Sequence, residues 1–219
     1  MGTLRLVVAG GNEISRKGLC ALVREQPDWD LAAEACDGRE AVETTKQIEP
    51  DVAIMDIDMP TLNGLDATRQ IASSVLKTKV LLLASHDTDE LLPLAIEAGA
   101  RGYLLKSDPA EDLVSAVEAM RDGRSFFTGR AACEVLRGYL ESLEKMGRAR
   151  NKDSRRLSGR EREVTQLLAE GYSSKEVAVA LQISTATAET HRHNLMQKIG
   201  CHSVAGLVRY AIRNHIIEA

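Results

Sequence analysis

The stretch LSGREREVTQLLAEGYSSKEVAVALQISTATAETHRHNLMQKIG, residues 157–200, decides the fold of the C-terminal part of this chain. It contains two S-x-x-E sequences, Ser158 to Glu161 and Ser173 to Glu176. In such a capping box, the serine and glutamate side chains each accept a hydrogen bond from a free backbone N–H at a helix start. Helical apolar spacing without a strand pattern continues to the end of the chain. The sequence predicts an all-α four-helix domain, with helices over 158–170, 173–181, 184–199 and 203–216.

Tight turns join the first three of these helices, which is the layout of a helix-turn-helix, whose last helix enters the major groove of DNA. One side of helix 184–199 carries residues at helical spacing that are expected to face the core: Ala188, His191, Leu195 and Ile199. The opposite side presents candidates for contacts to base edges: Ala186, Glu189, Thr190, His193 and Gln197. The flanks present candidates for phosphate contacts: Lys175, Thr187, Arg192, Asn194 and Lys198.

Glu189 is the unusual member of this set, because a carboxylate in the groove opposes the DNA phosphates. It can accept a hydrogen bond from the amino group of cytosine. We therefore predict a C·G preference opposite Glu189. The alternative is that Glu189 is a solvated or intrahelical residue, since many groove-facing positions lack direct base contacts.

Residues 1–125 show a different pattern, in which short β-rich apolar segments alternate with helical ones. The predicted strands are 4–9, 31–36, 51–55, 79–84 and 102–105, and the predicted helices are 14–26, 38–48, 64–74, 88–98 and 109–122. The last helix is expected to begin with Asp108 as N-cap, Pro109 at its first position and Glu111 at its third. This alternation predicts an α/β doubly wound, flavodoxin-like, five-stranded parallel sheet with helices on both faces.

Between the two domains we expect a linker over 126–157 that contains a helix at about 129–147. Residues 1–147 contain 16 Lys and Arg against 25 Asp and Glu, and residues 148–219 contain 12 against 7. The two parts therefore carry −9 and +5, which sum to the −4 of the chain. A basic module on an acidic chain is typical of polyanion binding, although solvated basic faces are common and the motif is the stronger argument.

Cysteine spacing and hydropathy exclude other classes. The four cysteines are widely separated and form no CxxC pair, which argues against a zinc site or a disulfide framework. The N-terminus lacks the pattern of a secretion signal, and no apolar run approaches the ~20 residues of a membrane span. We therefore expect a cytoplasmic protein.

The segments LSGREREV, EGYSSKEVA, LQISTATAETHRHNLMQKIG and SVAGLVRYA resemble the DNA-binding domain of LuxR-type regulators. With the α/β domain before it, the chain resembles the NarL/FixJ class of response regulators, which join a receiver domain to this helix-turn-helix domain. The resemblance implies a DNA-binding transcriptional regulator with domains at 1–125 (receiver), 126–157 (linker) and 158–219 (DNA-binding). It also implies as partners double-stranded DNA, a second copy of the chain, and a sensor kinase or another regulatory protein.

The final helix carries an apolar stripe that includes Val204, Leu207, Val208 and Ala211. In the family this helix commonly helps to form the dimer, so the resemblance implies a dimerisation role for these residues. The alternative is that the stripe packs on the core of its own domain. A dimer would require two symmetry-related half-sites about one helical turn apart.

The segment MDIDMPTLNGLDAT, residues 55–68, resembles the phosphoacceptor segment of receivers and aligns Asp56 with the aspartate that accepts a phosphoryl group. Lys106, in GYLLK, matches the lysine of the same fold, and Tyr103 matches its switch aromatic residue. We expect these three side chains to converge at the C-terminal edge of the sheet, where ligand sites of such folds lie.

The same pocket departs from the family in VVAGGNEISRKG, residues 7–18. Gly10 and Gly11 stand where the family carries two acidic residues. Ala84 stands where it carries Ser or Thr, although Ser85 follows. Loss of the hydroxyl at Ala84 is expected to remove the group that lets Tyr103 turn inward.

Phosphoryl transfer needs a divalent cation, and Mg²⁺ requires oxygen ligands in near-octahedral arrangement. Asp56 alone supplies too few oxygen ligands for Mg²⁺, and binding would require a further oxygen from Asp58 or Glu13. Asp58 occupies a position where the family uses a backbone carbonyl. We therefore expect weak or absent Mg²⁺ binding, no other cofactor, and an atypical receiver switched weakly or not at all by phosphorylation.

Three alternatives remain open. The chain could be a conventional response regulator activated by phosphorylation at Asp56. It could be gated by a small ligand at the receiver pocket, since Gly10 and Gly11 leave backbone N–H groups near a helix start that could meet an anion. A flavodoxin-like enzyme is disfavoured because GGNEISRKG lacks the glycine spacing of nucleotide-binding loops.

Overall fold

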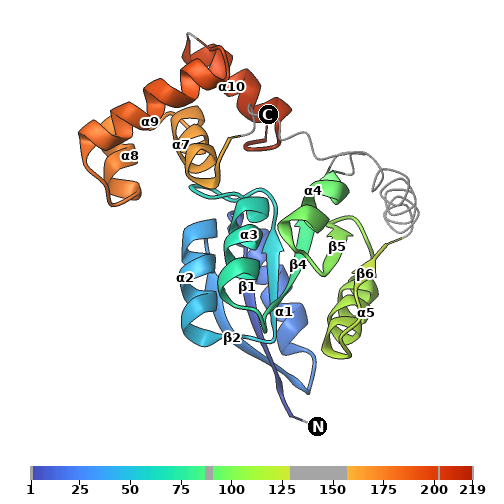
Figure 1. Ribbon diagram of the computed structural model, residues 1–219. Helices are drawn as coiled ribbons and strands as arrows, with labels where there is room; N and C mark the ends of the chain where they lie inside the picture. The colour runs from blue at the N-terminus through green and yellow to red at the C-terminus, as the bar shows by residue number, and fades with distance from the viewer. Residues whose placement is uncertain (1, 87–90, 129–156, 202, 219) are drawn as a thin grey trace, which may run out of the picture. The chain divides into compact units, whose positions relative to one another are not determined.

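A computed structural model of the 219-residue chain describes residues 2–86, 91–128, 157–201 and 203–218 (Figure 1). The chain divides into two compact units, Met1–Ala149 and Arg150–Ala219. The helix expected at about 129–147, with most of the expected linker, lies outside the described residues. The domain boundaries given above therefore stay predictions.

The first unit alternates strands and helices. Its elements are β1 (Leu4–Ala9), α1 (Glu13–Arg24), β2 (Trp29–Ala35), α2 (Gly38–Ile48), β3 (Val52–Asp56), α3 (Gly64–Ser74), β4 (Lys79–Ala84), α4 (Leu91–Ala98), β5 (Gly102–Leu105), α5 (Ala110–Arg121) and β6 (Phe126–Phe127). The sheet order is β2-β1-β3-β4-β5-β6, and every pair is parallel. This confirms the doubly wound α/β fold. The strand order reverses between β1 and β3, so their C-terminal ends border the crevice where ligands bind in such sheets.

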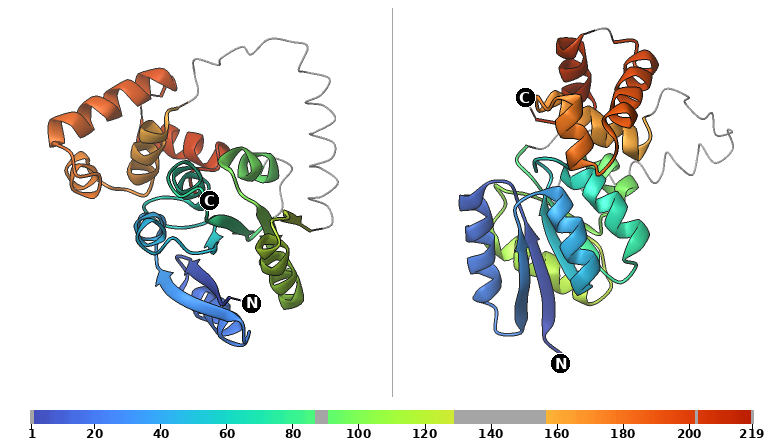
Figure 2. Two further views of the ribbon diagram at one scale, coloured as in Figure 1. Left: turned by 60° about the horizontal axis from the view of Figure 1, so that its bottom comes forward. Right: turned by 90° about the vertical axis from the view of Figure 1, so that its left-hand side faces the viewer.

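Helices cover both faces of this sheet, with α1 and α5 on one side and α2, α3 and α4 on the other (Figure 2). Successive residues of a strand point to opposite faces. Ile54 packs in a cluster with Val117 of α5, and Met55 packs in a cluster with Leu65 of α3. Both faces of the central strands are thus buried, which explains their continuous apolar runs.

The prediction of five strands is wrong, because β6 adds a sixth. Phe126 pairs with Gly102 and Phe127 with Tyr103, in residues that the sequence assigned to the linker. Phe126 packs against the core cluster on the α5 side, and Phe127 packs against the cluster on the other face. Two residues between turn sequences are too few to show strand alternation, so the sequence gives no sign of this strand, and its backbone pairing with β5 identifies it.

The start of α5 also differs from the prediction. Pro109 is the N-cap residue and makes no side-chain cap bond, so Asp108 is not the N-cap. The Asp108 carboxylate instead accepts hydrogen bonds from the Leu105 backbone N–H at 2.9 Å and from the Thr128 hydroxyl at 2.9 Å. Asp108 therefore joins the end of β5 to the residue that follows β6.

The second unit contains α7 (Gly159–Ala169), α8 (Ser174–Ala180), α9 (Thr185–Lys198) and α10 (Val204–Arg213). Both predicted capping boxes are present, at Ser158 with Glu161 and at Ser173 with Glu176. Ser184 caps α9 through the Thr187 N–H at 3.1 Å. The core of this unit is a single apolar cluster from all four helices. The predicted all-α four-helix domain is confirmed.

No helix in the described ranges is long and apolar enough to cross a membrane.

Candidate functional site

The phosphoacceptor candidate lies at the C-terminal edge of the sheet. Asp56 is the last residue of β3, and Lys106 directly follows β5. The Lys106 Nζ lies 2.6 Å from Asp56 Oδ2, and the two side chains are 27% and 3% exposed. Two residues 50 positions apart in the chain therefore form a largely buried ion pair at the crevice that the strand order predicts.

A chain of hydrogen bonds extends from this pair. Lys106 Nζ also donates to the Ser85 hydroxyl at 3.1 Å, and that hydroxyl donates to Asp58 Oδ2 at 3.1 Å. The Asp58 backbone N–H donates to Asp56 Oδ1 at 3.1 Å. Ser85 thus brings a hydroxyl to the pocket from the position next to Ala84, whose methyl group is buried in the core.

Burial raises the pKa of Asp56, and the hydrogen bond and positive charge of Lys106 lower it, with a net rise above the usual value. Removal from water therefore outweighs the attraction of the ammonium group. The charged carboxylate is tolerated in this pocket because Lys106 and the Asp58 N–H compensate part of its lost hydration.

Gly10 and Gly11, just after the end of β1, have different surroundings. A Cβ added at Gly10 would lie 3.7 Å from Asp56 Cβ and 3.9 Å from Asp56 Oδ2, which are ordinary contacts. A Cβ at Gly11 would lie only 2.7 Å from Cδ of Pro60, closer than real Cβ atoms come. The Pro60 ring therefore occupies the space that a side chain at Gly11 would need.

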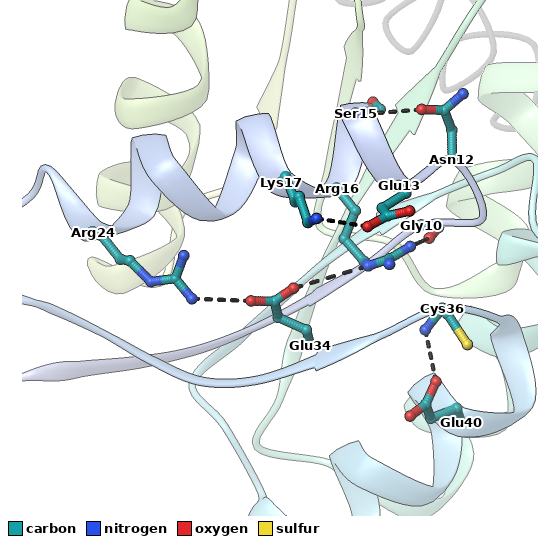
Figure 3. A network of polar contacts seen from close by, with 10 residues as sticks. All are labelled: Gly10, Asn12, Glu13, Ser15, Arg16, Lys17, Arg24, Glu34, Cys36 and Glu40. Carbon is teal, nitrogen blue, oxygen red and sulfur yellow. Dashed lines mark hydrogen bonds and ion pairs between the residues drawn. The ribbon is translucent and has the colours of Figure 1, made fainter.

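Each carboxylate considered as a metal ligand already has a partner. Glu13 pairs with Lys17 at 2.6 Å on the exposed side of α1 (Figure 3). Asp58 accepts from Ser85, and Asp56 binds Lys106. Within the described ranges, no group of three His, Cys, Asp or Glu side chains is placed to hold a metal ion. Mg²⁺ usually keeps several waters and binds one or two carboxylates, so Asp56 and Asp58 are the carboxylates that would hold it here, and weak or absent Mg²⁺ binding stays a prediction.

Arg16, which the sequence reading did not select, fixes the glycine loop. Its guanidinium donates to the Gly10 carbonyl oxygen at 2.7 Å and lies 3.9 Å from a carboxylate oxygen of Glu34 on β2 (Figure 3). Glu34 also pairs with Arg24 at 3.0 Å. Because these partners lie on three separate elements, no local sequence pattern could have identified the network.

Tyr103 is 1% exposed and lies inward in the core. It pairs with Leu82 across β4 and β5 and packs in the same cluster as Ala84. Tyr103 is therefore inward in this structure although Ala84 carries no hydroxyl, and the expected loss of a turn that follows phosphorylation stays a prediction. The small methyl group leaves this face of the sheet able to hold the ring without any phosphoryl group.

The recognition-helix candidate α9 has the two faces that the sequence predicts. Ala188 and Leu195 are buried, and His191 and Ile199 are half-buried. All five candidates for base contacts are exposed: Ala186, Glu189, Thr190, His193 and Gln197. One face of α9 is therefore free to meet a partner while the other anchors the helix.

The candidates for phosphate contacts are less uniform. Lys175, Thr187 and Asn194 are exposed, whereas Arg192 and Lys198 are half-buried. The Lys198 Nζ lies 2.8 Å from Glu161 Oε2 of α7. Glu161 was predicted only as a capping residue, and its contact with a lysine 37 positions away has no local sequence signal.

The dimerisation candidates on α10 divide into two groups. Leu207 and Ala211 are 2% and 0% exposed and pack inside their own domain. Val204 is 51% exposed and Val208 is half-buried. This placement favours the alternative of core packing for Leu207 and Ala211, and it leaves Val204 and Val208 as the accessible part of the stripe.

Comparison with known proteins matches both units to families. Residues 7–118 match the response regulator receiver domain, and residues 155–211 match the luxR family of bacterial regulatory proteins. The chain is 34% identical over 216 residues to the oxygen regulatory protein NreC of Staphylococcus carnosus, covering 98% of this chain and 100% of that protein.

Two solved structures are also similar. The response regulator ChrA of a heme-sensing two-component system is 32% identical, covers 99% of this chain and 100% of its own, and has a TM-score of 0.52. A LuxR-family response regulator from Aurantimonas is 31% identical, covers 64% of this chain and 99% of its own, and has a TM-score of 0.59. With a receiver sheet, a helix-turn-helix domain and a full-length relative at this identity, the chain belongs to the two-component response regulators that carry a LuxR-type DNA-binding domain.

Proposed function

We propose that this response regulator binds operator DNA as a dimer through the exposed face of α9, and that phosphorylation of Asp56 switches it weakly or not at all. The proposal is regulatory rather than enzymatic, and it places the protein in the cytoplasm with its DNA. The observation that carries it is a contrast: α9 keeps a free polar face, whereas Asp56 is buried in a pair with Lys106 beside two glycines.

The first half of the proposal is supported by the exposure of the predicted contact residues. Recognition helices of this motif read base edges through their N-terminal residues, and Ala186, Glu189 and Thr190 lie in the first two turns of α9. Lys175 on α8 and Asn194 are exposed and suited to phosphate contacts. A dimer would place two such helices on half-sites about one helical turn apart.

The second half rests on the electrostatics of the pocket. Opposite unit charges at ~4 Å and an effective dielectric of ~20 attract by about 4 kcal/mol before the cost of desolvation. The Asp56–Lys106 pair, at 2.6 Å, can hold the pocket in one arrangement without a phosphoryl group. Dimerisation, a regulatory protein such as a sensor kinase, or a small ligand would then control the regulator.

Glu189 provides the test of DNA readout. An operator selected by the wild-type protein is expected to show a C·G preference at one position of each half-site, because the Glu189 carboxylate accepts from the cytosine amino group. Glu189→Gln should relax that position and leave the others unchanged. His193→Gln, on the same exposed face, is the matched control and should keep the C·G preference opposite Glu189. An unchanged base preference in Glu189→Gln would sink this assignment.

A genome-wide binding map of wild type and Asp56→Ala tests the receiver half. Equal sets of bound sites are expected, because the proposed DNA surface does not depend on a phosphoryl group at Asp56. If Asp56→Ala lost most sites while remaining folded and equally abundant, the conventional phosphorylation-activated alternative would hold instead.

A further inference from the structure

The two capping boxes of the DNA-binding unit have the same local hydrogen bonds, but only the one at the start of α7 also contacts another helix. In α8, the Glu176 carboxylate accepts the Ser173 N–H at 2.8 Å, within its own cap. In α7, Glu161 Oε2 accepts the Ser158 N–H at 2.7 Å and also binds Lys198 Nζ at 2.8 Å. Glu161 therefore connects the start of α7 to the last residue of α9.

The neighbouring residue Arg160 makes a second connection between helices. Its Nη2 donates to the Leu181 carbonyl oxygen at 2.9 Å, at the C-cap of α8. Its Nη1 pairs with Glu163 at 2.8 Å, which holds the guanidinium in place. A cation is stabilised at a helix C-terminus because the free carbonyl groups there carry partial negative charge. Two consecutive residues of α7 thus bind the C-terminal ends of both α8 and α9.

We propose that the first turn of α7 is a positioning element for DNA recognition, in which Glu161 acts through Lys198 to hold α9, and Arg160 holds α8. Lys198 is then an internal link of the domain rather than a phosphate contact. This inference rests on the proposed function, since it assumes that α9 reads DNA.

The location of Lys198 on α9 supports this assignment. Helix α9 has 14 residues, which corresponds to about 21 Å at 1.5 Å per residue. Base contacts in this motif come from the N-terminal residues of the recognition helix, and Lys198 lies at the opposite end. Its side chain is 29% exposed and that of Glu161 is 17% exposed, so the ion pair is mostly shielded from water. A small shift at this fixed end changes the angle at which the reading end meets the bases.

The test uses full-length protein and a selected operator, with Glu161→Gln, Lys198→Gln and the double variant. Each single variant should weaken specific binding by roughly 3- to 10-fold, in the range found for residues that act without touching the ligand. The double variant should be no weaker than either single one, because both remove the same link. Glu176→Gln, which removes the charge from the other capping box but touches no link between helices, is the matched control and should bind like wild type.

Salt dependence separates a link from a phosphate contact. The loss of one phosphate contact reduces the slope of log K against log salt by about 0.9. Lys175→Gln should show that reduction, and Lys198→Gln should keep the wild-type slope. If Lys198→Gln instead reduced the slope while Glu161→Gln left affinity unchanged, Lys198 would be a phosphate contact and the proposal would be overturned.

A measurement without DNA keeps this inference distinct from the proposed function. Amide hydrogen exchange at residues 195–199 of the free protein should accelerate in Glu161→Gln and Lys198→Gln but not in Glu176→Gln. Equal exchange in all three variants would overturn the positioning role. If wild type bound no operator, the proposed function would fail, and this exchange comparison would still decide whether Glu161 holds α9.

Discussion

Two carboxylates of this protein each bind a lysine ammonium group, yet the pKa of one is raised and the pKa of the other is lowered. Asp56 in the receiver binds Lys106 at 2.6 Å, and Glu161 in the DNA-binding unit binds Lys198 at 2.8 Å. Burial raises the pKa of Asp56 beyond what Lys106 offsets. Burial also raises the pKa of Glu161, but the hydrogen bonds from Lys198 and Ser158 outweigh it and the pKa is lowered.

This difference follows from exposure and from the number of donors. Asp56 is 3% exposed, whereas Glu161 is 17% exposed and lies at a helix N-terminus, which favours negative charge. The Glu161–Lys198 pair therefore adds to the stability of the start of α7, which the capping box with Ser158 already favours. The Asp56 pair lies in a pocket that buries the carboxylate more deeply, next to Gly10.

The largest effect is expected from removing Lys106. Lys106→Ala leaves a buried carboxylate without its cation and should cost about 3 kcal/mol of receiver stability at neutral pH. The Asp56 pKa would rise further above its unfolded value of ~3.9. The stability contributed by protonated Asp56 would then be fully present below pH ~3.9 and lost as pH rises through the folded pKa of Asp56. Urea denaturation between pH 4 and 8 measures both effects.

Lys17→Ala is the matched control for that variant. It removes an exposed pair with Glu13 at 2.6 Å, between side chains that are 70% and 66% exposed. Such a pair on a helix contributes only a few tenths of a kcal/mol. A cost for Lys106→Ala as small as that for Lys17→Ala would mean that the pocket is wetter than the structure implies.

A medium effect is expected at the glycines. Gly11→Ala must displace Pro60 and should cost about 1 to 3 kcal/mol, as overpacking does. Gly10→Ala places its methyl group at ordinary contact distances and should cost less than about 0.5 kcal/mol. Thermal denaturation of the two variants measures the difference. Equal costs would show that the loop after β1 can move freely away from Pro60.

A smaller effect than that of Lys106→Ala is expected at Glu161, with the opposite pH dependence to the receiver pair. Its lowered pKa contributes stability that is present above the unfolded value of ~4.3 and lost as pH falls through the folded pKa. Glu161→Gln should therefore cost about 1 kcal/mol at pH 7 and progressively less below pH 4. Urea denaturation followed by NMR signals of α9 checks this. A cost that grew toward acid pH would contradict the comparison.

Much of the fold is encoded in short-range signals. The two S-x-x-E boxes locate the starts of α7 and α8, and continuous apolar runs locate the five longer strands. The strand β6 was not predicted because two residues are too short to show an alternating pattern. The role of Asp108 was predicted wrongly because an aspartate before a helix is a common N-cap. Its carboxylate instead accepts hydrogen bonds from Leu105 and Thr128, which the sequence does not mark.

The candidate site is less accessible to sequence reasoning. The resemblance pairs Asp56 with Lys106, and helical spacing separates the two faces of α9. The links from Glu161 to Lys198 and from Arg16 to Glu34 depend on tertiary packing, so no local pattern marks them. Ser85 was visible in the sequence as the hydroxyl next to Ala84, but only the structure shows its hydrogen bond with Lys106.

We propose that DNA binding does not depend on a phosphoryl group at Asp56. The most direct test is the operator affinity of the full-length protein before and after incubation with a small phosphodonor and Mg²⁺, with the mass of the protein recorded in parallel. We predict no stoichiometric labelling of Asp56 and an unchanged affinity. Prompt, stoichiometric labelling at Asp56 with tightened operator binding would show that phosphorylation of Asp56 activates the protein.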